Sequence, residues 1–177
     1  MTERPALIAA VILATTGSAA AAPATPTEAA TLFYKAYLAM PSTGGLPDAA
    51  TQAKLAPLVT DGLRRLLAEA DRAEARHQRA TKGAEPPMIE GDPFTSLFEG
   101  ATAFDVGACE ELGQSATCAI GLDADDGKGG RVEWTDQAIV VHGADGWRLD
   151  NIKYGGTWAF GLHGDLREVL KGVVAAK

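Results

Sequence analysis

The spacing of apolar residues changes at Pro87 from the period of a helix to the period of a strand. Before Pro87, apolar residues recur every three or four positions in three segments. After it, apolar and polar residues alternate over four runs, residues 102–110, 116–123, 130–142 and 146–154. Helical spacing returns near Asp165. Helices and strands that are segregated in this way predict an α+β fold, with helices packed in a four-stranded antiparallel sheet.

The predicted helices are marked by their capping residues. Thr25, Pro26 and Glu28 have the pattern of a capping box at the start of the first helix. Asp48 is placed to cap a short second helix, and Thr60 to cap a long third one. If the sheet curves around a helix, it forms a cone that is open at one end, where pockets are common.

The N-terminus, residues 1–22, has the order of a secretory signal peptide. Arg4 precedes a short apolar run, and small residues follow it up to Ala22. The run is shorter than the roughly 20 residues that span a bilayer, so cleavage is expected to leave no membrane anchor. We therefore expect a periplasmic or secreted protein, with a linker over residues 23–26 and one domain over residues 27–176. An uncleaved N-terminal anchor is the alternative.

The two cysteines agree with export. Cys109 and Cys118 flank a turn-like segment centred near Gly113, so they are expected to oppose each other across a hairpin. Opposed positions of this kind approach closely enough for a disulfide, and two free thiols are the alternative. The chain has no Cys-x-x-Cys motif and no clustered histidines, so we expect no metal and no cofactor.

The formal net charge of the 177-residue chain is −7, which argues against nucleic acid as a partner. Residues 86–127 contain nine acidic residues and no Lys or Arg. This acidic run spans the cysteine hairpin and could steer a cationic protein partner to it. A solvated acidic surface without a partner is the alternative.

No familiar catalytic arrangement is present in the sequence. It lacks the Gly-x-Ser-x-Gly elbow and the phosphate-binding loop, and its three histidines lie in separate segments. An enzyme of this shape would need an acid or base in the open end of the sheet. The candidates for lining such a pocket are Tyr37, Asp105, Trp134, Tyr154 and Trp158. A solvated position is the alternative for Asp105, and core packing is the alternative for the aromatic residues.

Three segments carry a resemblance to a known family. They are Phe33-Tyr34-x-x-Tyr37-Leu38, Gly-Asp-Pro-Phe at residues 91–94, and Gly-Trp-Arg-Leu-Asp-Asn-Ile-Lys-Tyr at residues 146–154. Together they resemble the domain-of-unknown-function family 3828, exported bacterial proteins of the nuclear-transport-factor-2-like and cystatin-like superfamily. The resemblance covers residues 27–174 and implies a helix held in a strongly bent, cone-shaped sheet. It implies no activity and no catalytic residues.

These observations predict an exported binding or protein-interaction module, for example of the immunity type, that is not an enzyme. A small enzyme, or a carrier that holds a small lipophilic ligand in the cone, is the alternative, and a purely structural role in the cell envelope is the third hypothesis.

Overall fold

The structure is a computed structural model that describes residues 22–41, 44–125 and 127–176. In these ranges the helices are α1 (Pro26–Leu38), α2 (Ala49–Leu55), α3 (Asp61–Thr81) and α4 (Leu166–Ala175), with a short 3-10 helix at Ala56–Leu58. The strands are β1 (Ala103–Leu112), β2 (Ser115–Asp125), β3 (Arg131–Gly143) and β4 (Gly146–Lys153). The predicted α+β class is confirmed.

The predicted signal peptide, residues 1–22, lies outside the described residues apart from Ala22. Within the part of the chain that the structure describes, no helix combines the length and the apolar character needed to cross a membrane.

The capping residues act as the sequence predicts. The Thr25 hydroxyl accepts a hydrogen bond from the Glu28 amide at 3.2 Å, and the Glu28 carboxylate accepts one from the Thr25 amide at 3.2 Å. Asp48 and Thr60 each accept a hydrogen bond from a backbone amide in the first turn of α2 and α3, and Asp165 does the same for α4. Each cap satisfies an amide that has no partner inside its helix.

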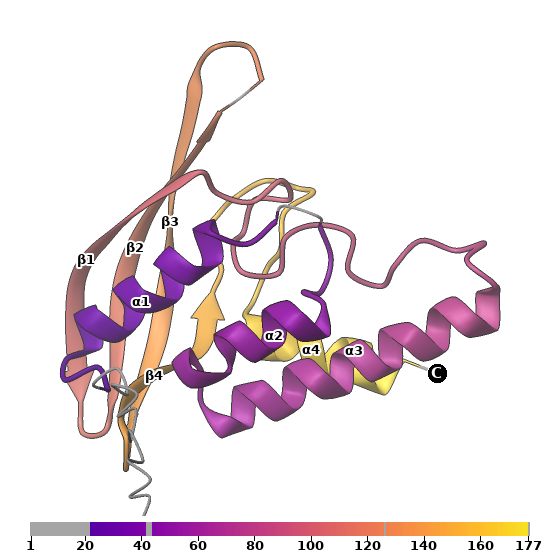
Figure 1. Ribbon diagram of the computed structural model, residues 1–177. Helices are drawn as coiled ribbons and strands as arrows, with labels where there is room; N and C mark the ends of the chain where they lie inside the picture. Colours follow the sequence, from indigo (N-terminus) through magenta and orange to yellow (C-terminus); the bar gives the residue numbers. More distant parts are fainter. Residues whose placement is uncertain (1–21, 42–43, 126, 177) are drawn as a thin grey trace, which may run out of the picture.

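The four strands form one antiparallel sheet in the order β1-β2-β3-β4 (Figure 1). The register places Cys109 opposite Cys118, and the two residues form the predicted disulfide. The pairing shifts between Val106 and Cys109, and again between Ile139 and Val140. Such irregularities bend a strand and increase its twist, so they add curvature to the sheet.

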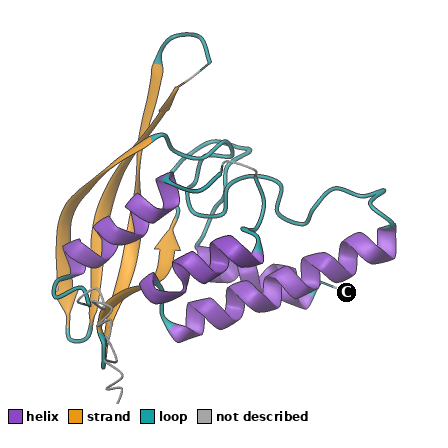
Figure 2. Ribbon diagram, viewed as in Figure 1, coloured by secondary structure: helices purple, strands orange, loops and turns teal. Residues whose placement is uncertain are grey.

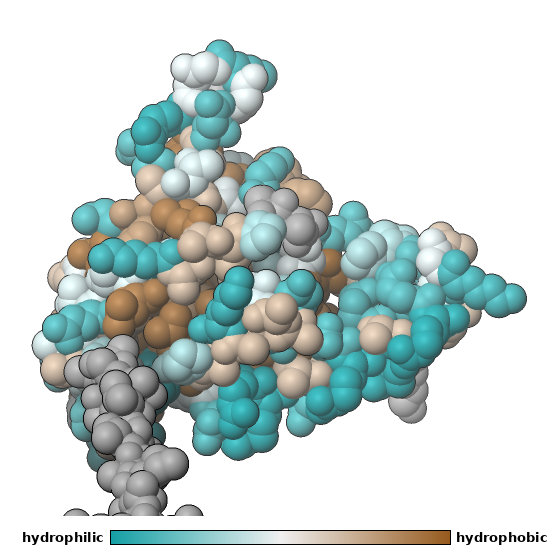
Figure 3. Space-filling model, viewed as in Figure 1, coloured by the Kyte–Doolittle hydropathy of each residue, from teal (hydrophilic) through white to brown (hydrophobic). Residues whose placement is uncertain are grey.

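The helices cover the sheet in two groups. α1 contacts all four strands, and it buries Phe33, Tyr34 and Tyr37 against them. α3 and α4 pack against each other and against β4, with α2 beside α3 (Figure 2). In Figure 3 the surface along α3 is hydrophilic, and hydrophobic areas lie over α1. Leu32 and Leu38 are exposed residues of α1.

The loop between α3 and β1 contains an unusual buried stretch, residues 91–101, which we call the covering loop. Gly91, Gly100 and the five residues from Pro93 to Leu97 are buried although they belong to no helix or strand. Buried backbone needs hydrogen-bond partners, and here they come from β3, α1 and the glycine-containing segment 154–164. The covering loop therefore brings distant parts of the chain together.

Candidate functional site

Asp136 is a carboxylate in the interior of the fold. It lies on the core-facing side of β3 between Trp134 and Ala138, and its exposed fraction is 0%. It accepts hydrogen bonds from the Ser96 amide at 2.9 Å, from the Ser96 hydroxyl, and from the Gly155 amide at 2.8 Å. The Trp134 indole Nε1 donates a fourth at 3.3 Å. One side chain thus ties the covering loop and segment 154–164 to the sheet.

Glycines allow the chain to pass so close to this carboxylate. A Cβ atom on Gly155 would collide with the backbone oxygen of Thr135, and one on Gly156 would lie 2.9 Å from the Cβ atom of Ser96. The Gly156 amide also donates a hydrogen bond of 3.0 Å to the Ser96 hydroxyl. Any larger residue would push segment 154–164 away from Asp136.

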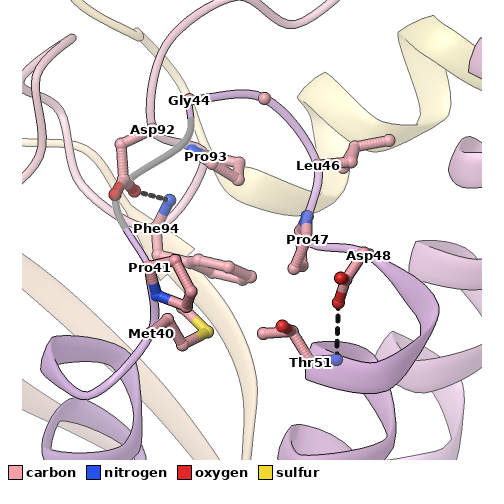
Figure 4. A pocket seen from close by; sticks show the side chains of 11 residues that line it. Met40, Pro41, Gly44, Leu46, Pro47, Asp48, Thr51, Asp92, Pro93 and Phe94 are labelled. Atoms are coloured by element: carbon pink, nitrogen blue, oxygen red, sulfur yellow. Dashed lines mark hydrogen bonds between the residues drawn. The ribbon is translucent and has the colours of Figure 1, made fainter.

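Asp92 is the second carboxylate of the site and lies at the start of the covering loop. Its Oδ2 accepts a hydrogen bond from the Tyr37 hydroxyl at 2.9 Å, and its Oδ1 accepts one from the Phe94 amide at 2.7 Å (Figure 4). The Tyr37 hydroxyl in turn accepts a hydrogen bond from the Ala101 amide at 2.8 Å. Asp92 and Tyr37 therefore join both ends of the covering loop to α1.

Burial raises the pKa of Asp92 to about 6, because the desolvation of the charged carboxylate outweighs the hydrogen bonds from Phe94 and Tyr37. Burial also raises the pKa of the Tyr37 hydroxyl, which stays protonated and acts as a donor. Asp92 therefore gains and loses a proton in the range in which an acid–base group is useful.

Gly100 makes room for the contact between Asp92 and Tyr37. Its φ is +82°, a conformation that other residues rarely adopt. A Cβ atom at this position would lie 2.7 Å from Asp92 Oδ2 and 2.8 Å from the Tyr37 hydroxyl.

Three hollows reach Asp92 from different sides. One of 220 Å³ lies against α2 and is lined by Met40, Pro47 and Thr51 among others (Figure 4). One of 240 Å³ lies against α4, and one of 300 Å³ lies beside the end of α1 and Glu99. These volumes are at or below the lower end of the range of about 300–1,000 Å³ that is usual for small-molecule pockets.

Four of the five predicted pocket residues gather around the covering loop. Tyr37 binds Asp92, and Trp134 binds Asp136. The Tyr154 hydroxyl donates to the backbone oxygen of Pro93 at 2.6 Å, and burial raises its pKa. Trp158 packs edge-to-face on Trp134, with ring centroids 5.4 Å apart.

Asp105 is placed differently from the other four. It is exposed, and it pairs with Gly121 on the face of the sheet opposite Ile120 and Asp136. This placement agrees with the alternative stated from the sequence, a solvated position for Asp105.

Tyr34 adds an unpaired hydroxyl to the interior. Its ring packs against the rings of Phe33, Tyr37 and Phe104, and its hydroxyl is buried with no hydrogen-bond partner among the described residues. Burial is the main cause that raises its pKa, and the charge of Asp136 adds to it.

The pocket residues predicted from the sequence include neither Asp136 nor Asp92. The signal for Asp136 was a carboxylate at a core-facing position of an alternating strand. Ser96 gave no such signal. Among the described residues, no group of His, Cys, Asp and Glu side chains is arranged to hold a metal ion. Comparisons of the chain with protein-family models, curated proteins and solved structures find no match.

Proposed function

We propose that the chain is an exported, non-enzymatic module that binds a cationic protein partner. The observation that carries this proposal is the state of Asp136. A catalytic base in the interior would need a free, accessible oxygen, whereas Asp136 is 0% exposed and accepts four hydrogen bonds. The geometry gives this carboxylate a structural role, and recognition is left to the surface.

Two further observations support the location and the fold in this proposal. The Cys109–Cys118 disulfide suits an oxidising compartment, the periplasm or the medium. The packing of α1 against all four strands supports a cone-like arrangement of the nuclear-transport-factor-2-like kind. The proposed membership of family 3828 rests on the three sequence segments that resemble it.

The acidic residues of the run 86–127 offer two surfaces to such a partner. Glu110 and Glu111 are exposed next to the β1–β2 turn, within the hairpin that the sequence singled out. Glu90, just before the covering loop, and Glu99, within it, are also exposed. At the other end of the hairpin, Asp123 is ion-paired with Arg131 and is less available.

Site-specific photo-crosslinking in living cells tests the proposal. A photoreactive phenylalanine analogue is placed at Phe160 near the covering loop, at Leu112 beside the hairpin turn, and at Arg72 on α3 as a control; all three positions are exposed. We expect one discrete adduct at Phe160 or Leu112, which weakens when the neighbouring glutamates are changed to lysine. The absence of an adduct at both positions would refute the proposal.

A second candidate function is a small enzyme or a carrier of a lipophilic ligand, and Asp92 favours it. This residue has a raised pKa, contacts Tyr37 and borders three hollows. A fragment screen by NMR tests it. A ligand whose shifts centre on Asp92, and whose affinity drops at least about tenfold in Asp92→Asn, would favour this function over the first.

A further inference from the structure

The hollow between the covering loop and α4 is an apolar groove that also contains acidic residues. We call it the phenylalanine groove. Its apolar lining consists of Met88, Ile89, Phe98, Phe160, Leu162 and Val169. Glu90, Gly91 and Asp92 complete the lining, so the groove contains two carboxylates and no basic residue.

The two aromatic rings of this groove are unusually open to solvent. Phe160 is 64% exposed and Phe98 is 41% exposed, whereas Phe33 and Phe94 in the interior are buried. The Phe98 ring lies directly on the backbone at Gly91, where an added Cβ atom would be 2.6 Å from ring carbon Cδ2. Exposed aromatic residues beside a hollow are typical of contact surfaces.

The two carboxylates that line the groove have no cationic partner among the described residues. Among the described residues, Asp92 and Glu90 form no ion pair with a Lys, Arg or His side chain. The partners of Asp92 are a tyrosine hydroxyl and a backbone amide, both neutral. A cation next to Asp92 would therefore interact with a partly desolvated carboxylate, and the low local dielectric constant strengthens their electrostatic attraction.

We propose that the phenylalanine groove binds a segment of a partner protein in which a large apolar side chain is followed by Arg or Lys. The apolar side chain packs between Phe98 and Phe160, and the cation reaches Asp92 and Glu90. This inference rests on the proposed function and specifies the surface and the chemistry of the partner.

Other occupants fit the groove less well. A second copy of the chain would bring the same acidic groove residues of two molecules together, and each molecule has a formal net charge of −7. A lipophilic small molecule would find only 240 Å³ and a carboxylate with no cation to offset it. A segment that is both apolar and cationic can pack against the two phenylalanine rings and pair with the two carboxylates.

Peptide titration of the 15N-labelled protein by NMR tests the inference. The probes are acetyl-Gly-Phe-Arg-Gly-amide and the same peptide with Gln in place of Arg, at neutral pH and low salt. We expect the arginine peptide to give saturable shifts at Gly91, Phe98 and Phe160, with a dissociation constant of about 1 mM or lower. The glutamine peptide should bind at least about tenfold more weakly.

Variants assign the binding to the groove. Phe160→Ala should weaken the binding of the arginine peptide at least about fivefold. Asp92→Asn should lower the affinity for the arginine peptide to that for the glutamine peptide. Glu90→Gln changes an exposed residue and gives a second test of charge if Asp92→Asn disturbs the fold. Leu112→Ala is the control, since Leu112 is 86% exposed next to the hairpin turn.

Equal affinity for the two peptides, or an unchanged affinity in Phe160→Ala, would overturn the inference. Shifts confined to Glu110 and Glu111 would also overturn it, but they would leave the proposed binding module intact. The crosslinking experiment tests the proposed function independently of the groove, because an adduct at Leu112 beside the hairpin turn would still support a protein partner.

Discussion

Asp136 and Asp92 both hold the covering loop, Asp136 from β3 and Asp92 from within the loop, yet their surroundings differ. Asp136 is buried and accepts four hydrogen bonds, whereas Asp92 accepts two and borders three hollows. Four donors make Asp136 a structural connection between segments, whereas at Asp92 desolvation outweighs the hydrogen bonds and raises the pKa. The comparison therefore separates a residue that holds the fold from one that is available to a ligand.

The largest effect is expected from Asp136→Ala. This change leaves the buried Ser96 amide and the Gly155 amide without their acceptor, so the free energy of unfolding should fall by about 3–5 kcal/mol. Urea unfolding measures it. Asp105→Ala, on the exposed face of the same sheet, is the control and should change stability by at most about 0.5 kcal/mol. A loss below about 1.5 kcal/mol for Asp136→Ala would show that the hydrogen bonds of Asp136 contribute little to the stability of the fold.

Gly100→Ala tests the second carboxylate. The backbone strain at φ +82° and the contacts with Asp92 and Tyr37 should together lower the free energy of unfolding by about 2–3 kcal/mol. Gly83→Ala is a matched control, because Gly83 has φ +72° and no atom within 4 Å of an added Cβ atom. Gly83→Ala should lower the free energy of unfolding only by the backbone strain, about 1 kcal/mol. Equal losses in the two variants would mean that the Asp92–Tyr37 contact tolerates displacement.

The pH dependence of stability tests the burial of Asp92. The pKa of Asp92 rises from 3.8 to about 6 on folding, so the native state holds this proton more tightly than the unfolded state. The contribution of Asp92 to stability is therefore complete below about pH 4 and is lost as the pH rises to about 6. We expect a loss of about 1–2 kcal/mol, reduced by partial exposure.

The difference between the wild type and Asp92→Asn isolates this effect from the other carboxylates. Urea unfolding at several pH values should show the wild type losing stability relative to Asp92→Asn between about pH 4 and 6, and no further change above. A difference that is constant with pH would show that the pKa of Asp92 is close to its ordinary value.

The sequence was informative wherever the signal is local. The caps at Thr25, Asp48 and Thr60 mark helix starts, and alternation with a central turn placed Cys109 opposite Cys118. These features depend on residues within a few positions of one another.

The covering loop could not be predicted in the same way, because it has no helical or strand period. Asp136 meets Ser96 at a distance of 40 residues along the chain, and Tyr37 meets Asp92 at 55. Partners so far apart are brought together by the tertiary fold, and no local pattern in Gly-Asp-Pro-Phe distinguishes a buried loop from an ordinary turn.

The smallest effect is expected at Tyr34, whose hydroxyl is buried in the interior. Because this hydroxyl has no partner among the described residues, Tyr34→Phe should leave the free energy of unfolding unchanged or raise it by up to about 1 kcal/mol. Tyr37→Phe is the matched variant, and it should lose about 1–3 kcal/mol with the hydrogen bonds to Asp92 and Ala101. Equal losses at both tyrosines would mean that the Tyr34 hydroxyl is hydrogen-bonded in solution. The interior of the fold would then hold a second hydrogen-bonded polar group besides Asp136. The difference in polarity between the interior and the surroundings of Asp92 would be smaller than the structure indicates.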